Sequence, residues 1–298
     1  MVDGPSAELD RLMGRVRAPL RLAVTGRPGA GCRTVAAAMR AAGVLIVTDQ
    51  RPEVMLYVLA DVPTDEDRDA LSGMMRRDQS CVAVLNKADL SGFRGSGPMA
   101  TARARCRALT RETGAPSAPL AALAARSGCR GLHDVVLVGL RTLALDPARL
   151  TAGIRRLLLA ELDLYGLAHG VAAVRAGASA DHTAAALRRA SGVDEVLAAV
   201  ERAGAVVRYR RFTLASALLL SRSPADDASV AARAELAADV LRTAGVPSLE
   251  PGIGTATKAD CLRTAVAWQR YARGPVGELH RDCARDLSRA WLRRWAAR

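Results

Sequence analysis

The feature that most constrains the fold is the alternation of short apolar runs with helical segments between residues 20 and 146. Each apolar run has the length of a strand and the unbroken apolar character of strands buried on both faces of a sheet. Parallel strands need a crossover between them, usually a helix. The alternation therefore predicts an α/β domain with a doubly wound, mostly parallel sheet. Its strands are expected at Leu20–Thr25, Val44–Val47, Val54–Ala60, Cys81–Leu85 and Pro119–Leu123, and its helices near 33–42, 65–77, 100–112 and 131–144.

The character of the chain changes after residue 146. One amphipathic helix is expected at 7–17, ahead of the sheet domain, and the second half reads as antiparallel helices. One short run, Ala205–Tyr209, has some strand character. The expected division is therefore an N-terminal helix at 1–19, an α/β domain at 20–146 and an all-α domain at 147–298. The helices of that last domain are expected at 148–176, 180–190, 193–203, 212–222, 226–244, 256–272 and 277–297.

A glycine-rich turn follows the first predicted strand. Gly26 and Gly31 match the two glycines of the phosphate-loop pattern G-x-x-x-x-G-K-[ST], with Gly29 between them. The backbone N–H groups of such a turn and of the helix after it favour an anion. The lysine position holds Cys32, however, and the Ser/Thr position holds Arg33. Two interpretations stand: an anion site in which an arginine replaces the lysine, or a turn kept because the strand-to-helix connection needs glycine.

A second motif, Asn86-Lys87-Ala88-Asp89, directly follows a predicted strand. This is the N-K-x-D pattern that reads guanine in GTP-binding proteins. A carboxylate at Asp89 can accept from both N1–H and the 2-amino group of guanine, which adenine cannot offer. Asn86 is the only asparagine of the chain, and Lys87 is one of two lysines. A similar string at Thr257–Asp260 follows a polar loop, and we interpret it as a helix start.

A third element supports the first two. The run Pro119–Leu123, with Ala122, lies where a guanine-backing loop is expected, and Gly131-Leu132 resembles the entry to the last helix of such domains. Through residues 20–146 the chain resembles the Era-like and dynamin-like branch of the translation-factor class of bacterial P-loop GTPases, which have a Ras-like G domain. Its helical half, especially Glu161–Gly166, resembles the helical tails of actinobacterial members. The resemblance implies binding of GTP or GDP through Gly26, Gly29, Gly31, Arg33, Asn86, Lys87, Asp89 and Ala122.

The parts that sense and hydrolyse the γ-phosphate in that family are not found in the sequence. The family's phosphate-loop lysine contacts the phosphates and the next residue binds Mg²⁺, so magnesium is not expected here. Asp49 is the best candidate for the D-x-x-G aspartate, but Pro52 replaces the glycine. The segment between Met39 and Val44 is too short for a switch loop. Cys32, at a helix N-terminus, is either a reactive thiol with a lowered pKa or a small buried residue.

The amino-acid composition gives the chain a strong positive charge. The formal net charge is +13 and the pI about 10.6, carried almost entirely by arginine. This favours an acidic partner, such as nucleic acid, a membrane surface or an acidic protein, unless it only reflects coding bias. The six cysteines form no C-x-x-C pair, and the N-terminus has no apolar core of signal-peptide length. A cytoplasmic protein is expected, at most peripheral to the inner face of the membrane.

The last predicted helix, 278–298, is amphipathic. Its arginines recur every four residues on one face, and an apolar stripe of Ala284, Leu287, Trp291 and Trp295 recurs on another. We expect the apolar stripe to dock on the helical domain, while the alternative is attachment to a lipid or acidic surface. A membrane-bound form would hold an anionic surface through Arg281, Arg285, Arg289 and Arg293.

Together these features predict a pseudo-GTPase with weak or no hydrolysis, acting as a regulatory or partner subunit, for which a second GTPase is the obvious partner. The alternative is a nucleotide-independent scaffold that binds an anionic membrane, RNA or an acidic protein through its basic helical half. A working GTPase with an unusual phosphate loop is a further alternative.

Overall fold

The computed structural model describes residues 5–48, 51–60, 62–92, 96–220, 227–249 and 256–298. The chain forms two compact units. The sheet unit comprises Leu20–Ala203, and the helical unit comprises residues 1–19 together with Gly204–Arg298. The expected boundary after residue 146 falls inside the sheet unit, which also takes in the helices up to residue 203.

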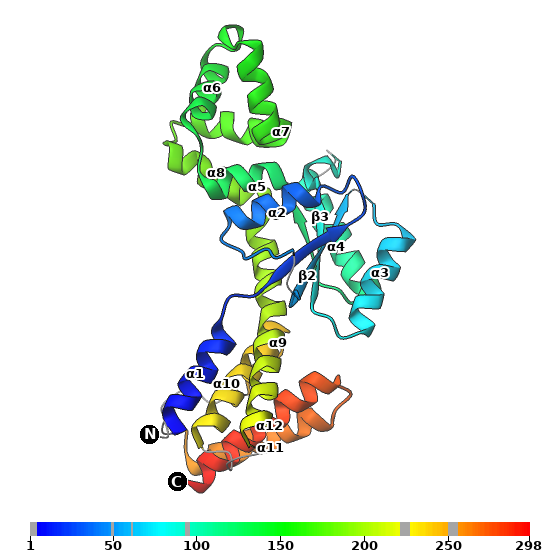
Figure 1. Cartoon of the computed structure of the whole chain (residues 1–298), viewed down its shortest axis with the longest axis vertical. Helices are drawn as coiled ribbons and strands as arrows, with labels where there is room; N and C mark the ends of the chain where they lie inside the picture. Colours follow the sequence, from blue (N-terminus) through cyan, green and yellow to red (C-terminus); the bar gives the residue numbers. More distant parts are fainter. Residues whose placement is uncertain (1–4, 49–50, 61, 93–95, 221–226, 250–255) are drawn as a thin grey trace. The chain divides into compact units, whose positions relative to one another are not determined.

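The sheet unit holds four parallel strands in the order β1-β2-β3-β4. Its helices alternate with the strands and then continue beyond them, as Figure 1 shows. The elements are β1 (Leu22–Gly26), α2 (Cys32–Ala41), β2 (Val54–Ala60), α3 (Asp65–Arg76), β3 (Cys81–Asn86), η1 (Ala88–Leu90), α4 (Pro98–Thr113), β4 (Ser117–Leu120), α5 (Ala122–Arg130), α6 (Asp134–Leu145), η2 (Pro147–Arg149), α7 (Ala152–Arg175), α8 (Ala180–Ser191) and the first part of α9 (Val193–Leu220).

Helices cover both faces of this sheet. α3 and α4 pack on one face through a cluster of buried residues that includes Tyr57, Ala83, Leu71 and Cys106. Side chains alternate between faces along a strand, so the intervening residues of β2 and β3 point to the face on which α2 and α5 pack together. The predicted α/β fold with a parallel sheet is therefore confirmed, with β1, β2 and β3 close to their expected bounds.

Two strand predictions were wrong in detail. The segment Val44–Val47 forms only an isolated parallel bridge, between Ile46 and Leu22 at the β1 edge. The run Pro119–Leu123 was expected to be all strand, but β4 ends at Leu120 and the unpredicted helix α5 begins at Ala122. Alanine, which dominates the start of that helix, has the highest helix propensity.

The helical part of the sheet unit contains one marked break. α7 has a non-helical residue, Asp163, with φ 55° and ψ −169°. The Asp163 carboxylate accepts a hydrogen bond from the amide of Gly166 at 2.9 Å, so it caps the second half of the helix. Within the described residues α7 is the one helix with the length and composition to cross a membrane. One such helix is weak evidence for a membrane span; Leu158 and Leu162 of α7 are buried in the sheet unit, whereas Leu164 is 74% exposed.

The helical unit consists of α1 (Pro5–Arg17), the rest of α9, α10 (Asp227–Thr243), α11 (Lys258–Arg273) and α12 (Glu278–Ala296). The predicted strand character at Ala205–Tyr209 was wrong, because these residues lie inside α9. Ala205, Tyr209 and Phe212 are buried with the i, i+4, i+7 spacing of one helix face. The predicted helix start at Thr257–Asp260 is confirmed by a capping box at the first turn of α11.

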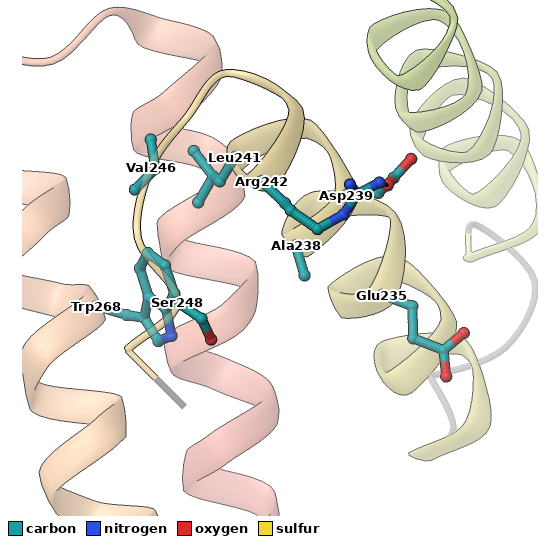
Figure 2. Close-up of a pocket in the computed structure, with 8 residues that line it drawn as sticks. All are labelled: Glu235, Ala238, Asp239, Leu241, Arg242, Val246, Ser248 and Trp268. Carbon is teal, nitrogen blue, oxygen red and sulfur yellow. Dashed lines mark hydrogen bonds and ion pairs between the residues drawn. The ribbon is translucent and has the colours of Figure 1, made fainter. Parts of the chain in front are cut away.

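A buried polar network ties three helices of this unit together. The hydroxyl of Tyr209 and the guanidinium of Arg233 each donate to the same carboxylate oxygen of Asp286, both at 2.6 Å. A cavity of about 310 Å³ also lies in this unit, between α10, the segment after it and Trp268. Figure 2 shows the residues that line it, among them Trp268 and the ion pair of Asp239 with Arg242.

Candidate functional site

The glycine-rich turn between β1 and α2 needs glycine at two positions for steric reasons. Gly26, Gly29 and Gly31 have φ of 153°, 83° and 89°. A Cβ atom at Gly26 would lie 2.3 Å from the Val58 carbonyl oxygen, and one at Gly31 would lie 2.4 Å from Asn86 Nδ2. At Gly29 a Cβ atom would meet nothing within 4 Å, so only its positive φ favours glycine there.

The two sequence motifs meet in space through hydrogen bonds. Asn86, the last residue of β3, is buried and its Nδ2 donates to the carbonyl oxygen of Ala30 at 2.9 Å. Lys87, in a left-handed conformation with φ 54°, donates from Nζ to the carbonyl oxygen of Gly29 at 3.2 Å. The Asn-Lys pair therefore holds the glycine turn from the side of β3, which the sequence alone could only suggest.

Asp89 follows in the short helix η1 and is only 8% exposed. Burial raises the pKa of this carboxyl, while its own backbone amide and the charge of Lys87 act in the opposite direction. Burial also raises the pKa of Asp163 in the α7 break, and the nearby charge of Asp89 raises it further. Asp89 is thus a mostly enclosed acceptor, and hydrogen bonds donated to it by a ligand would favour its charged form.

Ala122 lies at the same edge of the sheet. Leu120, the last residue of β4, is in register with Asn86, and Ala122 begins α5 directly beyond it. The amide of Ala121 already donates to the carbonyl oxygen of Ser191 at 2.9 Å. The amides of the first turn of α5 have no acceptors within the helix, and Ala122 contributes one of them.

The two arginines of the turn have different surroundings. Arg27 donates from Nε to the carboxylate of Asp67 at 3.0 Å, so its charge is already neutralised. Arg33 is exposed in the first turn of α2, and no ion pair to it is found among the described residues. α2 also has no side-chain cap at Gly31. Arg33 therefore remains the candidate for the missing lysine charge, and Arg27 does not.

The sequence did not reveal the hydrogen-bonding role of Asp67. This carboxylate accepts from Arg27, from the Tyr57 hydroxyl at 3.0 Å, and from the amide and hydroxyl of Thr64 at 2.9 Å each. Burial alone would raise the pKa of Asp67, but these hydrogen bonds outweigh it and the pKa is lowered. The only sequence signal was the T-x-x-D spacing of a capping box at the start of α3.

The alternative of a reactive Cys32 is not supported. Burial raises the pKa of the Cys32 thiol, and this outweighs the lowering effect of its backbone hydrogen bond. Since the thiolate is the nucleophilic form, Cys32 behaves as a small, half-buried residue. Asp49, the candidate D-x-x-G aspartate, lies outside the described residues. No group of three or more potential metal ligands is found among the residues that the structure describes.

The predicted docking of α12 is confirmed, because Ala284, Leu287 and Trp291 are buried against the other helices of the unit. Trp295 is only partly covered and lies under the ammonium of Lys258 at 5.3 Å. The arginine stripe of the same helix is engaged in local contacts with acidic side chains or a carbonyl group. These pairs are Arg281 with the Val276 carbonyl, Arg285 with Asp282, Arg289 with Asp286 and Arg293 with Asp227. Membrane attachment through this stripe stays a prediction.

Comparison with known proteins gives no match: no family model, no curated protein and no solved structure corresponds to this chain. What the site does is therefore inferred from its residues and their contacts.

Proposed function

We propose that the protein is a degenerate GTPase-like protein that binds a guanine nucleotide at the carboxyl edge of its sheet and hydrolyses GTP weakly or not at all. The observation that carries the proposal is the pair of hydrogen bonds from Asn86 and Lys87 to the carbonyl oxygens of the glycine turn. They bring a motif of the base-reading type and a phosphate-loop-like turn into contact. A chance resemblance of two short motifs would not require them to touch.

The position of the site in the sheet also supports a ligand. After β1 the chain forms the bridge at Ile46 along one edge of β1. It then crosses to the other edge of β1, where it forms β2. The strand order therefore reverses at β1, and open α/β sheets bind ligands outside the carboxyl ends of the strands at such a reversal. Gly26 ends β1 at this point.

The chemistry expected for the ligand follows from the residues. Asp89 would accept from the N1–H and 2-amino donors of guanine, and the stem of Lys87 would lie along the base. The uncapped N-terminus of α2 and Arg33 would face the phosphates. Arg33 occupies the position whose Ser/Thr hydroxyl binds Mg²⁺ in the family, so GDP or GTP is proposed to bind without Mg²⁺.

Weak or absent turnover follows from the same residues. Removal of the phosphate-loop lysine takes away a charge that acts on the β- and γ-phosphates in the transition state. Cys32 cannot replace it and Arg27 is engaged with Asp67, which leaves Arg33 without the switch loop and the D-x-x-G glycine that the family uses in hydrolysis. Such a protein would bind nucleotide without switching itself, so we propose that it serves as a regulatory or partner subunit of another protein, for which a second GTPase is the leading candidate.

One observation favours a second function. The glycine turn is held by Asn86, Lys87 and Asp67, all of them residues of the chain itself. A turn fixed in this way would also suit a scaffold that needs no nucleotide, with the basic surface binding a partner.

Titration with fluorescent GDP, GTP and ADP, each with and without Mg²⁺, separates these functions. We expect guanine nucleotides to bind with an affinity that Mg²⁺ does not change, ADP not to bind, and Asp89→Ala to abolish binding. Asp181→Ala, a change at an exposed aspartate of α8, is the matched control and should leave the affinity unaltered. Absence of any nucleotide binding would favour the scaffold, and equal affinity for ADP and GDP would refute the role of Asp89.

A further inference from the structure

An apolar surface with no intramolecular cover among the described residues lies on the hairpin of α6 and α7, away from the residues of the nucleotide site. Val135, Val138 and Leu145 of α6 are 51%, 58% and 87% exposed. Their spacing places them on one face of the helix, while Val136 and Leu140 on the opposite face are buried in the hairpin core. Three large apolar side chains in one exposed row on a helix this short are unusual for a surface that faces only water.

This surface is hollowed. A cavity of about 260 Å³ is lined by Val135 and Val138 from α6, by Leu150 just before α7 and by Ile154 in its first turn. Gly139 also lines the hollow and lies where the two helices are in close contact, since a Cβ atom there would lie 2.9 Å from Ile154 Cγ2. Figure 1 shows α6 and α7 side by side in this hairpin. The exposed row and the hollow together are called the α6–α7 surface below.

Positive charge surrounds the surface. Arg141, Arg149 and Arg155 are exposed next to it, and Arg149 also lines the hollow. Arg149 forms a 3.2 Å ion pair with Asp146, but both side chains are largely solvent-exposed and such pairs contribute little. No ion pair to Arg141 or Arg155 is found in the described part of the chain. Asp134, at the N-terminal end of α6, also lines the hollow, so three arginines stand against two aspartates, Asp134 and Asp146, around this surface.

We propose that the α6–α7 surface docks an acidic amphipathic helix of a partner protein, with an apolar side chain of that helix in the hollow and its carboxylates beside Arg141, Arg149 and Arg155. This is the helix-in-groove mode of recognition, in which apolar anchors at i, i+3 and i+7 fill a groove. Charged residues at the rim then set orientation and encounter rate more than affinity.

Two other occupants fit less well. A second copy of the chain in a two-fold dimer would place the same patch on both sides, so arginines would face arginines in a chain of net charge +13. An anionic membrane would match the arginines, but a flat lipid surface leaves a hollow of this size unfilled. Neither alternative explains both the cavity and the charge.

The test uses the full chain and a fluorescein-labelled 18-residue peptide helix with leucine at i, i+3 and i+7 of each repeat and glutamate on the flanks. Fluorescence anisotropy should give an affinity about tenfold or more higher for this peptide than for a scrambled one of the same composition. Val138→Asp should weaken binding about tenfold or more. Arg149→Glu combined with Arg155→Glu should weaken it and remove most of its salt dependence.

Matched controls distinguish binding at the α6–α7 surface from nonspecific binding to exposed apolar or basic side chains. Leu214→Asp changes an equally exposed leucine of the helical unit, and Arg189→Glu changes an exposed arginine of α8. Both should leave the peptide affinity unchanged. If Val138→Asp does not fold, methyl NMR of the unmodified protein replaces it, and the peptide should shift the Val135 and Val138 signals. Equal binding of the scrambled peptide, unshifted methyl signals, or Val138-dependent flotation on phosphatidylglycerol vesicles in place of peptide binding would overturn the proposal.

Discussion

The contact between the glycine turn and Asn86 can be tested by comparing Gly29→Ala with Gly31→Ala, because only the second places a Cβ atom against Asn86. Gly29 and Gly31 have nearly equal φ, 83° and 89°, so alanine suffers a similar backbone strain at both. That strain is about 1–2 kcal/mol for an L-residue in the left-handed region. At Gly29 the new Cβ atom meets no other group, whereas at Gly31 it would lie 2.4 Å from Asn86 Nδ2.

The additional loss at Gly31 follows from the hydrogen bond that must shift. Asn86 is buried, and its Nδ2 donates to the Ala30 carbonyl oxygen at 2.9 Å. Displacement of a buried amide from its acceptor costs about 1–3 kcal/mol. Gly29→Ala should therefore lower the free energy of unfolding by about 1–2 kcal/mol, and Gly31→Ala by about 2–5 kcal/mol. The difference between these two losses in the free energy of unfolding measures the contact with Asn86.

Urea unfolding followed by circular dichroism measures both changes. All three tryptophans, Trp268, Trp291 and Trp295, belong to the helical unit. Tryptophan fluorescence therefore reports that unit separately, and its transition should not move. Gly31→Ala combined with Asn86→Ala should be less damaging than the sum of the two single changes, because both remove the same hydrogen bond. Equal losses for Gly29→Ala and Gly31→Ala, or strict additivity with Asn86→Ala, would refute this reasoning.

Three further outcomes are expected. Because the pKa of Asp89 is raised and guanine needs its ionised form, GDP affinity should fall on acidification at a higher pH than for an ordinary aspartate, while Asp89→Asn should bind weakly at every pH. Cys32→Lys with Arg33→Ser should raise GTP affinity, measured by anisotropy, without producing phosphate release, since no switch segment is restored. Asp286→Asn should lower the unfolding midpoint of the tryptophan signal by weakening the buried hydrogen bond from Tyr209, at a loss of about 1–3 kcal/mol; an unchanged midpoint would contradict the network.

Much of the sheet could be predicted because each strand is marked by a short apolar run in the sequence itself. Unbroken apolar runs identified β1, β2 and β3 close to their observed bounds. The end of β4 was misplaced because alanine and leucine suit both a buried strand and a helix. The continuity of α9 was missed because Val206 and Val207 favour strands, while packing in the helical unit decides the outcome.

The contacts that hold the site could not be predicted in the same way. The ion pair of Arg27 with Asp67 joins residues 40 positions apart, and no spacing rule connects them. The break at Asp163 arises from a conformation that aspartate rarely adopts, and its surroundings depend on how α7 packs. The two compact units could not be predicted from composition either, because they depend on which helices pack together.

The discontinuity of the helical unit has a consequence for biosynthesis. Leu12 and Val16 of α1 are buried against Phe212 of α9. α1 therefore leaves the ribosome long before the residue that covers its apolar side has been synthesised. At translation rates of about 5–20 residues per second, α1 waits roughly 10–40 s for that partner. The sheet unit, which is continuous in the chain, can form during this interval. A nascent chain stalled before Phe212 should therefore expose the apolar side of α1 to chaperones while the sheet unit already resists protease.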